Sequence, residues 1–593
     1  MTPPEHQEAP EPVTRTEPAQ NVSPPLPPPP PIVPPADFPV TWADPADEER
    51  LWQRDRMHWP DQATPLTFSV MEATFGPGFG AAARGLRLPL GEAAARRINT
   101  YLYMDMAPRG APPDAGQAAA AEEAMRAALG ALRASWEEQI LPEIHQHLRA
   151  WEAFDLEGAS LEELRGHLDE TVARFTRLIE LHFLAVFPAY LAVSELDEVY
   201  RDLLGGPAST FGAFDAYKLV QGLPNKTVEV GHALWRLSRA ALGQADVRAA
   251  LEGPAPAGEV VRALKGTEAG GAFLSDLREY LEAYGQRGDK FFDLEHPSWV
   301  EDPSPVFDNL RVYLTQPDDA DPAAAGAALA VEREEAVAAT RARLAGYPEA
   351  ARGQFEFLLA AAQVGVVITE DHGFWIDFRS SYKVRRVLVE MGRRLHAGGA
   401  LDHPDDVFML SVAEVRETAA ADPMPDRRAL VAERKAEMDR FAGVRPPDRL
   451  GTPPPPVALP DNAFMRSMAK FWGGEPGGPE VEETVEPGIV RGMPGSPGRV
   501  KGVARIIRNL SDADRLQPGD VLVAETTTPP WTPLFAVAGA VVTDTGGVLS
   551  HCAVVAREYG LPAVVGTRTG SDRIRDGEIV EVDGDAGLVH FGG

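Results

Sequence analysis

A single histidine, His551, stands where a glycine-rich turn meets the start of a predicted helix. Gly546 and Gly547 follow a short apolar run typical of a strand, and an apolar-periodic segment begins at Ser550 and ends at Gly560. The first N–H groups of a helix lack internal partners and the helix dipole favours anions, so a phosphoryl group on His551 would meet ready donors. Imidazole is also a nucleophile at neutral pH, which makes a covalent phosphohistidine chemically reasonable. The pattern alone allows an ordinary structural histidine as well.

The residues around His551 form a long motif without gaps. Its members are Thr543, Gly546, Gly547, Ser550, His551, Ala553, Ala556, Arg557, Glu558, Gly560, Pro562, Ala563 and Gly566. The motif resembles the phosphohistidine signature of the swivelling domain in the PEP-utilising enzymes, a family that includes rifampicin phosphotransferase and phenylphosphate synthase. The resemblance implies that His551 is the phosphorylated residue. Four residues are expected close to the phosphate: Thr545, Gly546, Gly547 and Ser550. Cys552 departs from the family pattern, and we expect it in the domain core rather than as a nucleophile.

Short polar motifs recur between residues 37 and 415, and their order resembles the helical acceptor-binding region of the same family. Five of their residues can donate, accept or shuttle protons, as deprotonation of an acceptor hydroxyl would require. These candidates for the acceptor site are His58, Tyr284, Arg287, His372 and Asp377. For each of them a structural, hydrogen-bonded role is the alternative. We interpret His182, which lies in an apolar run, as a satisfied core histidine.

Composition divides the chain into four segments. Residues 1–36 are Pro-rich and predict a disordered tail, whereas residues 37–444 have helical periodicity and predict the acceptor-binding domain. Residues 445–487 are rich in Pro and Gly and predict a linker on which the last domain swings. Residues 488–593 alternate between strand and helix patterns. We therefore expect a multidomain protein, with a large mainly α-helical domain followed by a small β/β/α swivelling phosphohistidine domain.

Two local patterns make these expectations specific. Ser160 and Glu163 have the spacing of a capping box before a long apolar-periodic run, and Pro188 should kink or end that helix. In the last segment, strands are predicted near residues 500–507, 519–524, 539–542 and 579–582.

Charge and composition exclude several classes of function. The 593 residues carry a formal net charge of −31, which argues against nucleic acid and anionic membranes as partners. No run reaches the roughly 18 apolar residues of a membrane span, and a secretory signal is not evident, so we expect a cytoplasmic protein. The single cysteine excludes an internal disulfide and a cysteine-based zinc cage. We assign no metal site from the sequence.

The source of the phosphoryl group is not evident in the sequence. It contains no P-loop, and helical patterns occupy the region where many members of the family carry an ATP-grasp domain. The expected donor is Mg-ATP bound by a separate ATP-grasp-type subunit, and the expected acceptor is a small molecule with a hydroxyl group. Two alternatives remain: a binding or regulatory protein that keeps the swivelling fold without turnover, and an enzyme with an unrecognised nucleotide site in its helical region.

Overall fold

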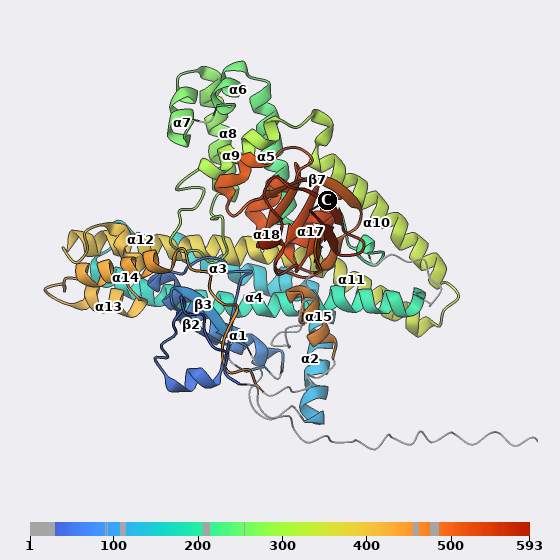
Figure 1. Cartoon of the computed structure of the whole chain (residues 1–593), viewed down its shortest axis with the longest axis horizontal. Coiled ribbons are helices and arrows are strands. Elements are labelled where there is room, and N and C mark those ends of the chain that lie inside the picture. The colour runs from blue at the N-terminus through green and yellow to red at the C-terminus, as the bar shows by residue number, and fades with distance from the viewer. Residues whose placement is uncertain are drawn as a thin grey trace, which may run out of the picture.

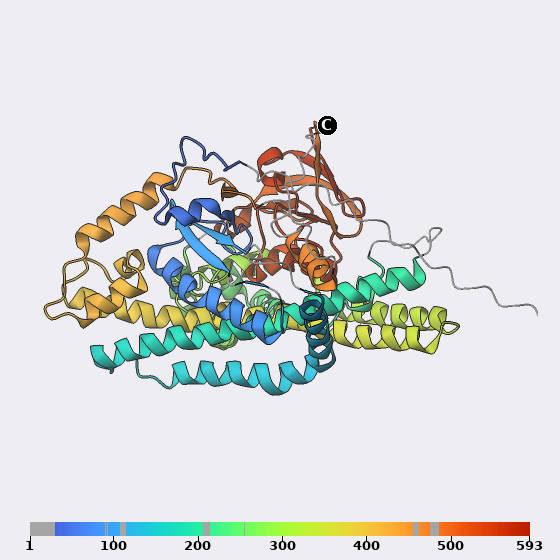
Figure 2. The same ribbon diagram turned by 90° about the horizontal axis from the view of Figure 1, so that it is seen from below.

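The computed structural model describes residues 30–88, 90–91, 93–106, 114–205, 214–253, 255–454, 462–474 and 486–592. A large helical region precedes a small β/α domain, as the sequence predicts (Figure 1). The β/α domain lies against one side of the longest helices rather than beyond their ends (Figures 1 and 2). This placement brings the C-terminal residues onto the middle of the helical region.

The helical region is built on two long rods that lie side by side (Figure 2). One rod is helix α4 (Leu161–Leu204), which begins at the predicted capping box of Ser160 and Glu163. The other is continuous from α11 (Glu349–His372) through the π-helical turn η5 (Gly373–Ser380) into α12 (Ser381–Ala397). Pro188 does not end α4. The helix continues to Leu204, and the buried proline lies inside it. Packing against neighbouring helices outweighs the local cost of that proline.

Shorter helices surround the two rods, and most of those outside residues 226–320 share one apolar core with the rods. In chain order they are α1 (Pro65–Gly85), α2 (Ala115–Ala134), η2 (Ser135–Ile140), α3 (Leu141–Glu152), η3 (Tyr217–Leu219), α5 (Lys226–Leu242), α6 (Ala245–Leu251), α7 (Ala257–Lys265), α8 (Glu268–Tyr284), α9 (Ser304–Leu314), η4 (Asp318–Ala320), α10 (Pro322–Leu344), η6 (Pro404–Met409), α13 (Val412–Ala420) and α14 (Arg428–Phe441). Helices α5 to α9 form a separate apolar cluster beside the β/α domain (Figure 1).

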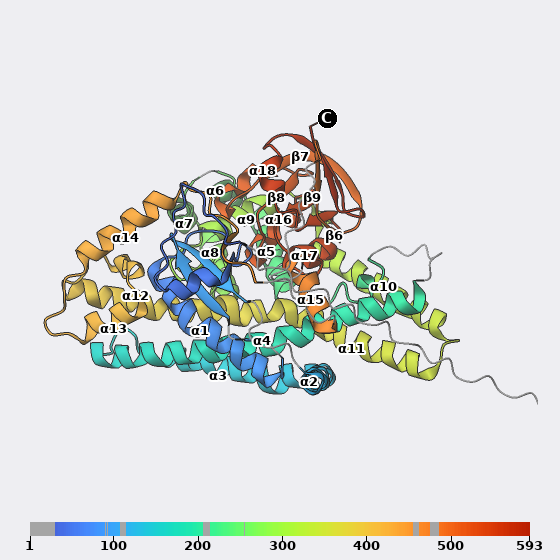
Figure 3. The ribbon, with the colours of Figure 1, turned by 60° about the horizontal axis from the view of Figure 1, so that its bottom comes forward.

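Two features of the N-terminal three-quarters were not predicted. A four-stranded sheet has the order β2-β3-β1-β4, with strands Ala94–Ile98, Tyr101–Asp105, Leu51–Arg54 and Arg449–Gly451. The last of these strands and helix α15 (Ala463–Trp472) fall inside the predicted linker 445–487. Helix α15 packs on α4 beneath the β/α domain (Figure 3). Linker residues 455–461 and 475–485, and residues 1–29 of the predicted tail, lie outside the described residues.

The β/α domain has one eight-stranded sheet with the order β5-β12-β11-β7-β8-β9-β10-β6. Its strands are β5 (Ile489–Arg491), β6 (Met493–Ser496), β7 (Arg499–Ile506), β8 (Val521–Ala524), β9 (Ala540–Thr543), β10 (Ala563–Val565), β11 (Ile579–Asp583) and β12 (Leu588–His590). The central four, β7 to β10, are parallel, and the strands outside them pair antiparallel. Its short helices are η7 (Leu510–Arg515), η8 (Pro529–Trp531), α16 (Thr532–Phe535), α17 (His551–Glu558) and α18 (Gly570–Arg573). The predicted strands and the helix beginning at His551 are thus present.

Two helical stretches are long and apolar enough to cross a membrane by length and composition: 161–204 and 349–397. In the first, 78% of the apolar window is buried inside the protein, and in the second 44%. Both belong to the rods around which the helical region packs, which explains their apolar character.

Candidate active site

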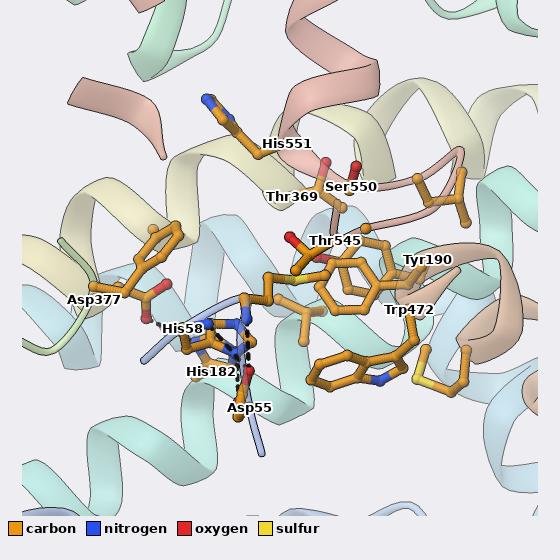
Figure 4. Close-up of a pocket in the computed structure, with 18 of the residues that line it drawn as sticks. Asp55, His58, His182, Tyr190, Thr369, Asp377, Trp472, Thr545, Ser550 and His551 are labelled. Carbon is orange, nitrogen blue, oxygen red and sulfur yellow. Dashed lines mark hydrogen bonds and ion pairs between the residues drawn. The ribbon is translucent and has the colours of Figure 1, made fainter. Parts of the chain in front are cut away.

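A cavity of about 130 Å³ lies where the β/α domain meets the helical region. The β/α domain contributes Thr545, Gly546, Ser550 and His551 to its wall. The helical region contributes polar side chains from several elements: Asp55, His58, His182, Glu370, His372 and Asp377. Figure 4 shows Ser550 and His551 on one side of this space and Asp55, His58 and His182 on the other. The cavity therefore joins the predicted phosphate carrier to part of the predicted acceptor site.

His551 is held at the domain boundary by a carboxylate of the helical region. Its Nδ1 lies 3.1 Å from Oε2 of Glu370, and that oxygen also accepts a hydrogen bond from the Thr227 hydroxyl at 2.7 Å. The side chain is 12% exposed, and Nε2 is buried without a hydrogen-bond partner among the described residues. A proton on Nδ1 leaves Nε2 with a free lone pair, which is the form that can attack phosphorus. In Figure 4 the ring points away from His58 and His182, so it must rotate to face them.

The backbone before His551 makes a tight turn at the helix start. Ser550 is the N-cap of α17, yet its hydroxyl makes no capping bond and is buried without a partner among the described residues. Gly546 has a φ of +86°, and a Cβ there would lie 2.7 Å from the Ser550 side chain. The turn thus requires glycine at this position, and it leaves one hydroxyl and one ring nitrogen unpaired at a helix N-terminus.

Gly547 allows the backbone of the β/α domain to lie close to helix α15. Its N–H donates to the Phe471 carbonyl at 2.8 Å, and a Cβ there would lie 2.0 Å from the Lys470 carbonyl oxygen. The N–H of Leu549 donates to the same Lys470 carbonyl at 3.2 Å. In this arrangement the Gly547 amide is therefore occupied by α15 rather than directed at His551. Thr545, the fourth predicted phosphate neighbour, lines the cavity.

Other polar contacts fix the β/α domain in place. Arg56 Nε lies 2.6 Å from Glu525 Oε1, and the Thr528 hydroxyl donates to the Asp289 carbonyl at 2.9 Å. At the end of α17, Glu558 accepts the N–H of Gly222 at 3.0 and 3.1 Å. Burial raises the pKa of Glu558 to about 7, despite this hydrogen bond.

His58 is paired with a carboxylate that the sequence analysis did not select. Its Nδ1 lies 2.8 Å from Oδ2 of Asp55, whose other oxygen accepts the N–H groups of Met57 and His58, each at 3.1 Å. Burial opposes the charged form of His58, but the Asp55 carboxylate outweighs it and the pKa of His58 is raised. This arrangement leaves Nε2 as the proton-accepting atom of an oriented imidazole.

His372 and Asp377 meet at the junction of α11 and η5, together with His182 from α4. His182 Nδ1 lies 2.9 Å from Asp377 Oδ1, and His372 Nε2 lies 3.5 Å from Asp377 Oδ2. Burial lowers the pKa of His372 to about 4, so this ring is neutral at pH 7. His182 has a partner, as expected, but it lines the cavity, so the interpretation as a plain core residue is corrected.

Tyr284 and Arg287, the other two candidates, are not among the residues that line the cavity. The Tyr284 hydroxyl donates to Glu229 at 2.8 Å, which with burial raises the pKa of Tyr284 to about 12. Arg287 is 2% exposed and lies over the rings of Trp299 and Phe378. Tyr284 is thus held within the helical region, whereas Arg287 makes ring contacts there and leaves Nε and Nη2 without a hydrogen-bond partner among the described residues.

The rest of the cavity wall is apolar. Its aromatic and methionine side chains come from the helical region and from α15: Met57, Phe75, Phe79, Met104, Met106, Phe183, Phe187, Tyr190, Phe291, Phe292, Phe464, Met465, Met468, Phe471 and Trp472. Cys552 also lines the cavity, and burial raises the pKa of its thiol to about 11, which keeps it protonated. Such a wall suits an apolar ligand whose few polar groups meet the histidines.

Four side chains of the site were not selected from the sequence: Asp55, His182, Thr227 and Glu370. Glu370 lies 181 positions from His551 in the chain, so no local pattern could pair them. Asp55 is the exception, because an aspartate three residues before a histidine is a common turn in which the carboxylate meets the imidazole.

Comparisons with known proteins match two parts of the chain to family models. Residues 182–370 match the family model described as the fourth domain of rifampicin phosphotransferase, and residues 516–587 match the mobile domain of PEP-utilising enzymes. The chain is 41% identical over 568 residues to chondramide synthase cmdD of Chondromyces crocatus, a match that covers 93% of this chain and 14% of that protein.

Two phosphotransferases are also similar. The chain is 31% identical to the uncharacterized phosphotransferase YvkC of Bacillus subtilis, over 69% of this chain and 47% of that protein. It is 31% identical to rifampicin phosphotransferase of Streptomyces sviceus, over 56% of this chain and 36% of that protein. The chain thus spans less than half the length of each of these three relatives.

Proposed function

We propose that this chain, a phosphotransferase-family member of the PEP-utilising enzymes that resembles rifampicin phosphotransferase, carries a phosphoryl group on His551 to a hydroxyl acceptor in the cavity. The observation that carries the proposal is the state of the His551 ring. Its Nδ1 is tied to Glu370, and its Nε2 is buried without a hydrogen-bond partner among the described residues. The hydroxyl of Ser550, the preceding residue at the start of α17, is likewise buried without a partner there. Unpaired buried polar atoms are costly, and a phosphoryl group bonded to Nε2 would account for the unpaired nitrogen.

The reaction has two transfers. In the first, His551 Nε2 attacks a phosphorus of the donor nucleotide, the bond from that phosphorus to its bridging oxygen breaks, and the rest of the nucleotide leaves with that oxygen. In the second, the acceptor oxygen attacks phosphorus, the N–P bond breaks, and His551 regains its lone pair. The acceptor proton passes to Nε2 of His58, whose Nδ1–H is held by Asp55. Positioning and charge neutralisation supply most of the rate.

The cavity wall supports a class of acceptor. Aromatic and methionine side chains surround a small group of polar atoms, so the acceptor is a phenol or alcohol with an apolar body. Tyr284 and Arg287 have no place in this proposal.

The donor in this proposal is Mg-ATP bound by an ATP-grasp-type partner subunit, and the chain works in the cytoplasm. Burial of Nε2 supports movement between two sites, because this atom is closed to solvent while the β/α domain is docked. The β/α domain must therefore leave the helical region to receive the phosphoryl group and return to transfer it to the acceptor.

The test is direct labelling of the histidine. The tag-free chain is mixed with candidate ATP-grasp-type proteins and with ATP labelled at the β or the γ phosphorus in separate reactions, and the label is scored for the acid lability and base stability of a phosphohistidine. We expect labelling of the wild type, none of His551→Ala, and full labelling of His590→Ala, a variant of an exposed histidine in the same domain. Equal labelling of His551→Ala would overturn the proposal, and absence of label from the wild type with every donor would favour a binding or regulatory role.

A further inference from the structure

Three side chains that the phosphoryl transfer does not use converge on the cavity: His182, His372 and Asp377. One nitrogen from each imidazole and one carboxylate oxygen all lie within 4.8 Å of one another. The two rings pack edge to face with centroids 4.6 Å apart, and Asp377 reaches one ring with each of its oxygens. His182 and Asp377 lie on the same side of the cavity as His58 (Figure 4).

The π-helical turn η5 creates this arrangement. Residues five apart on an α-helix point ~140° away from each other, because each residue turns ~100°. His372 and Asp377 are five apart, and η5 (Gly373–Ser380) lies between α11 and α12 with π-helical geometry, in which residues five apart are bonded neighbours. The widened turn thus places the carboxylate under the imidazole. Such local departures from α-helix occur frequently at functional sites.

The hydrogen bonds of His372 leave a lone pair directed at a carboxylate. Its Nδ1 lies 2.9 Å from the Ile368 carbonyl, which can only accept, so the proton of the neutral ring is on Nδ1. Nε2 then presents a lone pair to Asp377 Oδ2 at 3.5 Å, which is too long for a normal hydrogen bond. Two electron-rich atoms that face each other in a buried site repel each other, and a cation between them would stabilise the arrangement.

We propose that His182 Nδ1, His372 Nε2 and the Asp377 carboxylate bind a divalent transition-metal ion. Ligand atoms ~2.1 Å from one ion lie ~3.0–3.4 Å apart. Each imidazole is already 2.9 or 3.5 Å from one oxygen of Asp377, and the set within 4.8 Å would draw closer together around an ion. Two imidazoles and one carboxylate suit Zn²⁺, Co²⁺ or Fe²⁺ better than Mg²⁺. The Ile368 carbonyl on the far nitrogen of His372 is the support that metal-binding histidines usually have. On binding, the Nδ1 proton of His182 is lost or moves to Nε2 of the same ring.

Three protein ligands leave at least one coordination position for a ligand from the cavity. If the proposed function holds, the acceptor oxygen occupies this position, and the ion lowers the pKa of the hydroxyl before transfer. The binding site itself does not depend on that function.

The experiment measures metal binding without any phosphoryl transfer. Tag-free, full-length protein is stripped with a chelator and titrated with Co²⁺, whose visible absorption reports nitrogen and oxygen ligands, and then with Zn²⁺ in equilibrium dialysis. We expect one equivalent of each ion and a rise in the melting temperature with Zn²⁺. Asp377→Asn and His182→Gln should bind at least ~10-fold more weakly.

Controls separate this inference from the proposed function. His403→Gln changes an exposed histidine and should bind like the wild type, as should His551→Ala. Circular dichroism checks that each variant is folded. Absence of binding by the wild type, or wild-type binding and thermal shift in both ligand variants, would overturn the metal site. A failure to label His551 would contradict the proposed function but would not affect the conclusion about metal binding.

Discussion

The two sides of the cavity differ in how their polar atoms are satisfied. On the β/α domain, Ser550 and His551 present a hydroxyl and a ring nitrogen that have no partner within the described part of the chain, at the start of a helix. On the helical region, His58 and His182 are each paired with a carboxylate within 3 Å. His551 is also oriented by a carboxylate, Glu370, but of the described histidines it alone combines that contact with an unpaired ring nitrogen at a helix N-terminus. In our proposal, the first side carries the phosphate, and the second handles the proton or a cation.

The largest effect should come from the proton acceptor on the helical side. His58→Asn removes the oriented base, so transfer from His551 to an apolar phenol should slow ~10²–10⁴-fold. Loading of His551 should be unchanged, because His58 is remote from the donor step. Rapid-quench decay of the phosphohistidine measures the transfer, with His403→Asn as the exposed control. An equal loss of His551 phosphorylation and of transfer to the acceptor would contradict the division of roles between the two sides of the cavity.

Glu370 links the two sides, so its variants should affect His551 itself. Glu370→Ala removes a charge-assisted hydrogen bond of about 2 kcal/mol and should slow delivery from docked His551 ~30-fold. Glu370→Gln keeps an acceptor oxygen for Nδ1–H and should restore much of the rate. A purely structural role would predict no such rescue in the same decay assay.

The next prediction concerns the backbone contact with α15. In Gly547→Ala the new Cβ would meet the Lys470 carbonyl oxygen, a backbone atom that cannot rotate away. Docking should weaken by ~1–3 kcal/mol. Hydrogen exchange at Leu549, whose amide donates to the same carbonyl, should quicken. Gly353→Ala, at an open position on α11, serves as the matched control and should leave that exchange rate unchanged.

The smallest effect should be a pH dependence of docking through Glu558. Its pKa is about 7 when docked and near its ordinary 4.5 when released, so the docked form binds more protons between these values. Docking should therefore weaken as the pH rises through that window, by at most ~10-fold per unit, and become constant above it. Glu558→Gln should flatten the pH profile of docking, because it removes the titrating carboxyl. The neighbouring charges of Glu370, Arg333 and Arg557 remain. The exchange rate of the Gly222 amide against pH is the measurement, and an unchanged slope in the variant would contradict this role.

The sequence predicted the carrier side better than the helical side for a physical reason. The strand, turn and helix around His551 depend on neighbours within about 20 positions, so glycines and caps indicate them directly. The pairs Glu370–His551 and His182–Asp377 join residues 181 and 195 positions apart. The π-helical turn that aligns His372 with Asp377 has no composition signal of its own. Helix α15 was not predicted, because Pro- and Gly-rich stretches flank its ten residues.

The central claim is that Nε2 of His551 carries the phosphoryl group while Nδ1 keeps its proton. Peptide mapping of the loaded chain, followed by NMR of ring-labelled histidine, distinguishes phosphorus on Nε2 from phosphorus on Nδ1. The account predicts a single phosphorylated histidine, His551, with phosphorus on Nε2. Phosphorus on Nδ1, which faces Glu370, or on another histidine with His551 unmodified, would contradict it.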